Sequence, residues 1–443
     1  MTQSPMNEPQ TPISPDQQPT GEPLLRQLGP IGIWLLAING MIGAGIFGAP
    51  AGAAALTGIY SPLVFLACGA LLTAVILCFA ELASYFRNTG GPIVYVRAAF
   101  GEMAGFQTGW AFYIARVTAF AANINLLVAS IAWFWQPVAA GVGRVFMLGL
   151  VVLLLAVPNI VGTRHGMRSL GILTVLKFLP LLALLAFGIT SLTPSAFPVA
   201  STAFPDAISI GTAALLVIYA FVGWEAAVVP AGETRNPARD MPKALISAVL
   251  MVTVLYVLIQ AIAVARLPDL ADSERALVDL GQVLFGPAGA VLLTAAVVVS
   301  VGGNIASTMI TAPRLTYSLA RENTLPAWLG RVHPQFHTPA VSIVVFSLLV
   351  FALSVYGSFV WLAAMSALVR VLIYMACIAA MPRLRRRHGD QPGRFRIPGG
   401  WSVPTMAFIV STLLLFQVQW QSVLITLVFL MIGAVLFLWS KRQ

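Results

Sequence analysis

The stretch Asn39-Gly-Met-Ile-Gly-Ala-Gly-Ile-Phe47 lies in the middle of a long apolar segment, and the fold class follows from how it is interpreted. Gly40, Gly43 and Gly45 fall within six residues. Each glycine inside a helix costs about 1 kcal/mol relative to alanine. Small residues at this spacing can let two helices pack closely. We favour a local unwinding, which would leave free backbone N–H groups at the start of the second half-helix.

The composition is that of a membrane protein. Hydrophobic residues make up 59% of the 443 residues, and charged residues only 9%. A soluble domain carries about 25% charged residues. We therefore expect membrane lipids to contact most of the surface. The net charge of +10 is spread in short clusters between apolar stretches. This distribution does not indicate a nucleic-acid-binding face, and no nucleic acid partner is expected.

The apolar segments predict an all-α integral membrane protein. A membrane-spanning helix needs roughly 20 mostly apolar residues, and about twelve segments meet this requirement. They centre on 31–56, 61–86, 103–133, 145–162, 168–191, 208–231, 242–265, 282–313, 339–356, 358–381, 403–420 and 422–440. The polar segment 1–28 is expected to be a disordered cytoplasmic tail.

The basic residues predict the orientation. With the N-terminus in the cytoplasm, most Arg and Lys residues fall in cytoplasmic loops, whereas the opposite side carries only Arg144, Arg266 and Arg275 beside several acids. Basic residues favour the cytoplasmic side of a membrane. We therefore expect a multi-pass protein of the cell membrane (a bacterial inner or plasma membrane) with both termini in the cytoplasm.

A second break is predicted in the sixth apolar segment, at Tyr219-Ala-Phe-Val-Gly-Trp-Glu225. Gly223 and Pro230 interrupt this helix, and Glu225 is an acid at membrane depth. Breaks in the first and sixth spans have the spacing of a five-plus-five inverted repeat. A half-helix N-terminus suits a carboxylate, and freed carbonyls suit an ammonium group. We expect the repeats to occupy 29–191 and 205–381, with two additional C-terminal helices in 400–440.

Several motifs resemble those of the amino acid–polyamine–organocation (APC) superfamily. The run Gly43-Ala44-Gly45-Ile46-Phe47 is similar to its G-[SA]-G-I-F signature. Other segments resemble the family's second-span end and cytoplasmic loops: Glu81-Leu-Ala with Gly90-Gly91-Pro92-Ile-Val-Tyr95, Glu233-Thr-Arg-Asn-Pro-Ala-Arg-Asp-Met-Pro-Lys-Ala244, Arg321-Glu-Asn-Thr-Leu-Pro326 and Arg394-Phe-Arg-Ile-Pro398. Found together and in order, these motifs are specific for the superfamily.

The resemblance implies a LeuT-type fold with twelve spans and a substrate site between the first, third, sixth, eighth and tenth helices. It puts the α-carboxylate of an amino acid on the amides near Ala44 and Gly45. It puts the ammonium group on carbonyls near Met41, Tyr219, Ala220 and Val222, with Tyr219 as an aromatic lid. The expected substrate-binding residues are Met41, Ile42, Gly43, Ala44, Gly45, Phe112, Tyr219, Ala220 and Val222.

Lys177 and Glu225 are expected to act in gating or coupling. A fifth-span lysine similar to Lys177 occupies, in several APC branches, the place that sodium fills in sodium-coupled relatives. The resemblance therefore implies no sodium requirement, and either proton symport or amino acid exchange. Alternatively, the ammonium ties the broken first helix to the eighth. Glu225 matches an acid implicated in gating or proton response in one branch, and a purely structural role is the alternative.

Arg116 lies in the third span, where relatives have small or apolar residues, and we place it with the gating or coupling residues. If it faced the cavity, it would contact an acidic side chain or repel cationic substrates. We favour an ion pair with Glu225 or Glu81, because a buried guanidinium cannot neutralise itself. Arg370, near the cytoplasmic half of the tenth span, is expected to extend to the membrane interface.

These features favour a secondary transporter of amino acids, with neutral ones preferred because Met41, Phe112 and Val222 are apolar. An acidic amino acid or amine transporter that uses Arg116 in selectivity is the alternative. The sequence contains no HExxH, GxSxG or Gly-x4-Gly-Lys-Ser/Thr motif, so an enzyme is a remote reading. A channel is equally remote, because paired broken helices are not its pattern. We expect no cofactor, metal or obligate protein partner, only the substrate and, in symport, protons.

Overall fold

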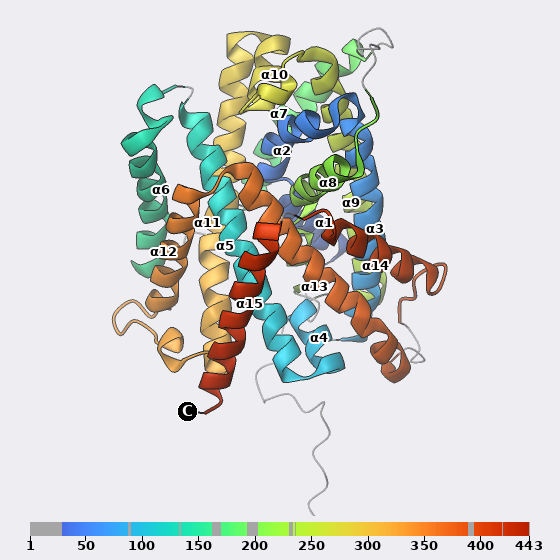
Figure 1. Cartoon of the computed structure of the whole chain (residues 1–443), viewed down its shortest axis with the longest axis vertical. Coiled ribbons are helices and arrows are strands. Elements are labelled where there is room, and N and C mark those ends of the chain that lie inside the picture. The colour runs from blue at the N-terminus through green and yellow to red at the C-terminus, as the bar shows by residue number, and fades with distance from the viewer. Residues whose placement is uncertain are drawn as a thin grey trace, which may run out of the picture.

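The computed structural model describes residues 29–86, 90–132, 134–161, 170–192, 203–229, 234, 236–388, 394–418 and 420–442. These residues form a bundle of helices, and no strand occurs among them (Figure 1). The predicted disordered tail 1–28 lies outside the described residues, as do Pro230 and Glu233 of the predicted second break and its following loop.

The structure describes fifteen α-helices along the chain. In order they are α1 Pro30–Met41, α2 Ala44–Thr57, α3 Ser61–Tyr85, α4 Pro92–Phe100, α5 Glu102–Ala132, α6 Gly141–Val161, α7 Leu170–Gly188, α8 Ala207–Phe221, α9 Pro237–Arg266, α10 Ala276–Phe285, α11 Pro287–Arg321, α12 Ala340–Tyr356, α13 Phe359–His388, α14 Ser402–Leu415 and α15 Trp420–Ser440. Short 3-10 turns are η1 Gly58–Tyr60, η2 Gln136–Val138, η3 Ile189–Ser191, η5 Trp224–Ala227, η7 Leu270–Asp272 and η8 Ala327–Gly330.

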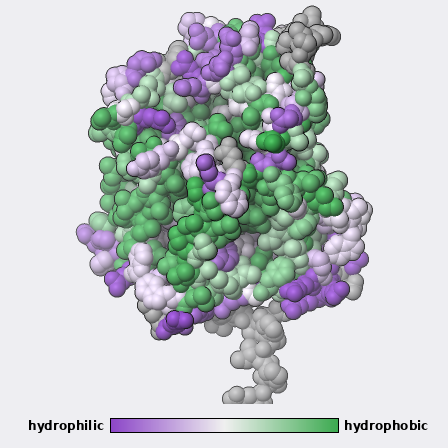
Figure 2. All heavy atoms as spheres, viewed as in Figure 1, coloured by the Kyte–Doolittle hydropathy of each residue, from purple (hydrophilic) through white to green (hydrophobic). Residues whose placement is uncertain are grey.

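The helices and the molecular surface are those of a multi-pass membrane protein. Eight helical stretches of the described chain are long and apolar enough to cross a membrane, and five shorter apolar helices accompany them. Figure 2 shows hydrophobic residues over most of the middle of the molecule and hydrophilic residues gathered at its two ends. On the peripheral helix α6, Leu153 and Leu154 are exposed. An exposed apolar band of this kind is the surface that contacts hydrocarbon.

The first predicted break is present between α1 and α2. Helix α1 ends at Met41, and α2 begins at Ala44. Gly43 lies between them with extended φ and ψ of −133° and −144°. The second break is also present, because α8 ends at Phe221. Gly223 follows with φ of +113°, a left-handed conformation that glycine adopts without steric cost.

The two breaks touch each other through backbone atoms. A Cβ atom added to Gly40 would lie 2.2 Å from the carbonyl oxygen of Gly223, and one added to Gly223 would lie 2.2 Å from the carbonyl oxygen of Gly40. Gly45 packs equally closely on Ala220. Close packing and unwinding, which the sequence presents as alternatives, therefore occur together at these glycines.

A tyrosine from a third helix joins the two breaks. The Tyr256 hydroxyl of α9 lies 2.9 Å from the Met41 carbonyl oxygen and 3.3 Å from that of Ala220. Tyr256 is fully buried, so these carbonyls receive a donor where no water or lipid could supply one. The paired breaks lie in the interior of the bundle, where α1, α2 and α8 meet (Figure 1).

We expect Gly40→Ala and Gly223→Ala each to lower the free energy of unfolding by about 1–3 kcal/mol, because the added methyl group meets a carbonyl that cannot move away. Gly302→Ala is the matched control, since nothing lies within 4 Å of a Cβ atom there. Thermal unfolding of the purified variants measures the difference. Equal midpoints for all three variants would show that the contact contributes nothing.

Candidate functional site

A cavity of ≈ 290 Å³ lies beside the paired breaks. This volume is near the lower end of the range for small-molecule pockets, about 300–1,000 Å³. The wall is built by α1, α2, α5, α7, α8, α11 and α13, together with η5. Along α11 the lining residues become more exposed from Asn304 to Thr311, so the cavity opens toward the end of α11 at Arg321.

Most of the substrate-binding residues predicted from the sequence line this one cavity: Met41, Gly43, Ala44, Gly45, Phe112, Tyr219 and Val222. Ile42 and Ala220 are buried and do not line it. Lys177, Glu225 and Arg116, predicted for gating or coupling, line the same cavity. The structure thus brings residues from five helices together, and their roles toward a substrate stay predictions.

The N-terminus of α2 faces the cavity with free donors. The first N–H groups of a helix have no partner within the helix, and no side chain of the described residues caps those of α2. Asn304 of α11 lies beside this terminus, because its Nδ2 atom would be 3.3 Å from a Cβ atom on Gly43. Such a terminus can bind an anion, and Asn304 can add a further donor.

Two asparagines, Asn123 of α5 and Asn304 of α11, form a polar contact in the cavity wall that was not predicted from the sequence. Asn123 Nδ2 donates to Asn304 Oδ1 at 3.0 Å, and Tyr219 donates through its hydroxyl to Asn123 Oδ1. The Tyr219 ring packs edge to face on the Phe359 ring, with 5.9 Å between the ring centroids. Tyr219 is therefore held against one wall of the cavity. The side-chain amides of Asn123 and Asn304 within apolar helices could have indicated this contact from the sequence, because polar groups at membrane depth are costly unless they have a role.

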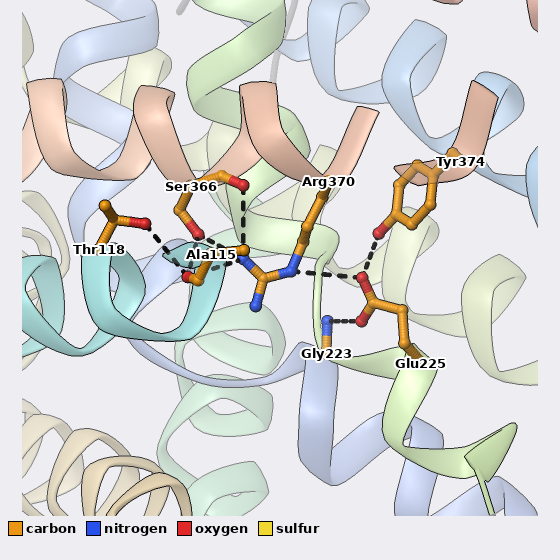
Figure 3. Close-up of polar contacts among 7 residues, drawn as sticks. All are labelled: Ala115, Thr118, Gly223, Glu225, Ser366, Arg370 and Tyr374. Carbon is orange, nitrogen blue, oxygen red and sulfur yellow. Dashed lines mark hydrogen bonds and ion pairs between the residues drawn. The ribbon is translucent and has the colours of Figure 1, made fainter. Parts of the chain in front are cut away.

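Glu225 binds the unwound end of α8 and two residues of α13 (Figure 3). Its Oε2 atom accepts from the Gly223 N–H at 2.6 Å, and its Oε1 atom accepts from the Tyr374 hydroxyl. Arg370 Nε lies 3.3 Å from Glu225 Oε1, and both side chains are less than a tenth exposed. The second break is thus stabilised by a carboxylate that is itself held by an arginine.

The prediction that Arg370 extends to the membrane interface is wrong. Besides the ion pair with Glu225, its Nη1 atom donates to the Ala115 carbonyl oxygen at 3.3 Å and to the Ser366 hydroxyl (Figure 3). The guanidinium has a buried carboxylate and oxygen acceptors of Ala115 and Ser366 within reach. It therefore gains nothing by extending to water.

The preferred ion-pair partners of Arg116 are also wrong. Glu225 pairs with Arg370, and Glu81 is bound by Arg385 at 2.6 and 2.9 Å. Arg116 Nη1 instead donates to the Thr311 hydroxyl at 2.7 Å, at the cavity wall. The physical reason is that Glu225 is directed toward α13 by its bond to the Gly223 N–H.

Lys177 supports the first break. Its Nζ atom donates to Asn39 Oδ1 at 2.8 Å and to the Ile42 carbonyl oxygen at 3.4 Å. Ile42 lies between α1 and α2, so its carbonyl is one that unwinding frees. The ammonium therefore ties α7 to the broken first span, and no bond from it to α11 is found in the described part of the chain. This contact does not test the predicted role in coupling.

We expect Glu225→Gln to destabilise the protein by about 3–5 kcal/mol, because Arg370 would remain buried without its counter-charge. The double variant Glu225→Gln/Arg370→Gln should recover part of the loss. The control is Glu322→Gln, which breaks the exposed Arg97–Glu322 pair and should cost at most about 1 kcal/mol. Thermal unfolding measures all three, and a loss in Glu225→Gln no larger than in the control would contradict the assigned ion pair.

Comparison with known proteins identifies the family. A family model described as amino acid permease matches residues 28–440. The branched-chain amino acid permease BcaP of Bacillus subtilis is 28% identical, covering 95% of this chain and 94% of the relative. The serine/threonine exchanger SteT of the same species is 27% identical, covering 85% of this chain and 87% of the relative. The Legionella pneumophila transporter lpg1691 is 30% identical, covering 74% of this chain and 75% of the relative. These relatives are transporters rather than enzymes, and the resemblance to the APC superfamily is confirmed. The chain belongs to the amino acid permease family.

Proposed function

We propose that the protein is a secondary active transporter that binds one amino acid at the paired breaks and moves it across the cytoplasmic membrane. The observation that carries this proposal is the cavity itself. A helix N-terminus with free N–H groups and the unwound end of a second helix border one small cavity in a chain of the amino acid permease family. Opposite backbone charges at such breaks are suited to the two ends of an amino acid.

The amides at the start of α2, near Ala44 and Gly45, would bind the α-carboxylate. The carbonyls of Met41 and Ala220 already accept from Tyr256. The Tyr219 carbonyl accepts from the Val222 N–H at 3.4 Å, so the Val222 carbonyl, just beyond the end of α8, is the better acceptor for the ammonium group. In this arrangement, the backbone recognises what all amino acids share.

The described helices support a LeuT-type layout of twelve spans. In this layout α1 and α2 together form the first span, and α8 with η5 forms the sixth. Helices α3, α5, α6, α7, α9, α11, α12, α13, α14 and α15 supply the other ten. Basic residues at the ends of α13 and α15 favour a cytoplasmic location for that face of the molecule and for both termini. The cavity would then open toward the cytoplasm.

Lys177 and Glu225 would link the breaks to transport. Each contributes a charge to the polar backbone of one break, Lys177 at the Ile42 carbonyl and Glu225 at the Gly223 N–H. A change of protonation at either group would alter the stability of the unwound segment beside it. Proton symport and amino acid exchange both fit this arrangement, and neither needs sodium.

The names of two relatives support a neutral substrate, since BcaP is named for branched-chain amino acids and SteT for serine and threonine. Met41, Phe112 and Val222 give the cavity an apolar part. The three cationic side chains in the wall, Arg116, Lys177 and Arg370, disfavour cationic amino acids. Neutral selectivity stays a prediction from the sequence.

We expect proteoliposomes containing the protein to take up amino acids without sodium. Lys177→Met should reduce the uptake rate by about tenfold or more, because the freed carbonyl at the first break loses its donor. Lys243→Met is the control, since this lysine is exposed. A sodium requirement would contradict the coupling proposed for Lys177. Failure to take up or bind any amino acid would contradict the function itself.

A further inference from the structure

The charges that line the cavity do not balance. Among the described lining residues, three side chains are cationic and one, Glu225, is a carboxylate. Glu225 pairs with Arg370, and Lys177 is bonded to Asn39 and the Ile42 carbonyl. Arg116 is left with the neutral hydroxyl of Thr311, and no carboxylate pairs with it anywhere in the described chain. Two positive charges of the wall therefore have no carboxylate partner in the described chain: Lys177, which is held by neutral oxygens of the first break, and Arg116, which lies farther along α11.

An arginine in this position favours an anion. A guanidinium stays protonated in proteins, so Arg116 cannot remove its own charge. Ionisable residues at membrane depth face a partner or a water-filled cavity and mark substrate pathways. Glu81, the other buried acid of the sequence prediction, is occupied by Arg385, Tyr85 and the Ile397 N–H. A ligand that enters the cavity is thus the available source of a counter-charge.

The position of Arg116 along the helices separates it from the start of α2. Asn123 of α5 bonds Asn304 of α11 at the level of the first break, and Arg116 bonds Thr311 of the same two helices. Seven residues separate the two contacts on each helix. At 1.5 Å per residue this is a separation of about 10 Å between backbone levels. The long side chain of Arg116 covers part of that distance.

We propose that Arg116 binds a side-chain carboxylate of the substrate, so that the cavity takes acidic amino acids in place of the neutral ones that the sequence predicts. This inference rests on the proposed function, which places the α-carboxylate at the start of α2 and the ammonium group at the end of α8. The side chain then extends along α11 toward Arg116. Ser307 and Thr308 line the wall between the two levels; the Thr308 hydroxyl donates to the Asn304 carbonyl, and the Ser307 hydroxyl can donate to a ligand on the way. An acidic side chain supplies the counter-charge that Arg116 lacks.

Binding to the purified protein tests the inference with two pairs of ligands, glutamate against glutamine and aspartate against asparagine. Within each pair only a carboxylate is exchanged for an amide of nearly equal size. A charge-assisted contact with a guanidinium should favour the acid by about tenfold or more. Calorimetry, or ligand-induced shifts of the unfolding temperature, gives the two dissociation constants.

Variants at Arg116 assign the preference to this residue. Arg116→Gln should bring the acid-to-amide ratio of affinities close to one while glutamine binding is kept. Arg116→Lys keeps the positive charge and should still bind glutamate more tightly than glutamine. This second variant keeps the test decisive if Arg116→Gln does not fold. Arg144→Gln is the control, because Arg144 bonds Asn125 and does not line the cavity.

Three outcomes would overturn the inference. The first is wild-type protein that binds glutamine as tightly as glutamate. The second is a preference for glutamate that survives in Arg116→Gln. The third is an equal loss of both ligands in that variant, which would place the α-carboxylate at Arg116. In each case amino acid binding, and with it the proposed transport, would stand, although the third outcome would move the α-carboxylate away from the start of α2. Only a wild-type protein that binds no amino acid would remove both.

Discussion

The contact between the backbones of two broken helices is the constraint on which the cavity depends. Gly40 and Gly223 meet so closely that neither has room for a Cβ atom. Unwound backbone at membrane depth is tolerated only where it is buried in protein or lines a cavity, because each unpaired polar group costs several kcal/mol. Both conditions hold here. The closeness of the two segments also brings donors and acceptors of opposite sign to one small volume.

Side chains from other helices satisfy the backbone groups that the breaks release. Tyr256 serves two carbonyls, Lys177 serves a third, and Glu225 accepts from the Gly223 N–H. Glu225 depends in turn on Arg370. The polar chemistry of the site is therefore held by long-range contacts, and a change in any of these charges acts on a break. In the proposed transporter, this arrangement would couple binding and conformational change in one place.

The glycines and the membrane-depth charges allowed the breaks to be predicted from the sequence, and the resemblance to the APC superfamily implied most of the cavity residues. Ile42 and Ala220 were expected among the substrate-binding residues, yet both are buried and do not line the cavity. The sequence cannot give the rotation of an unwound segment, because helical periodicity ends there. Asn123 and Asn304 were missed for a related reason: each is a single polar residue, and only their contact across two helices makes them a pair.

The sequence by itself determined that the protein lies in a membrane, because its composition has too few charged residues for a soluble domain. It also determined the position of both breaks, through the glycines, and the family, through motifs found in order. The tertiary structure decided which charged side chains form ion pairs with each other. Arg370 pairs with Glu225 and Arg385 pairs with Glu81, whereas Arg116 lines the cavity and bonds the Thr311 hydroxyl. Ion pairs join residues from distant helices, so they depend on how each helix is rotated and packed. That choice of partners is what distinguishes a structural charge from one available to a substrate.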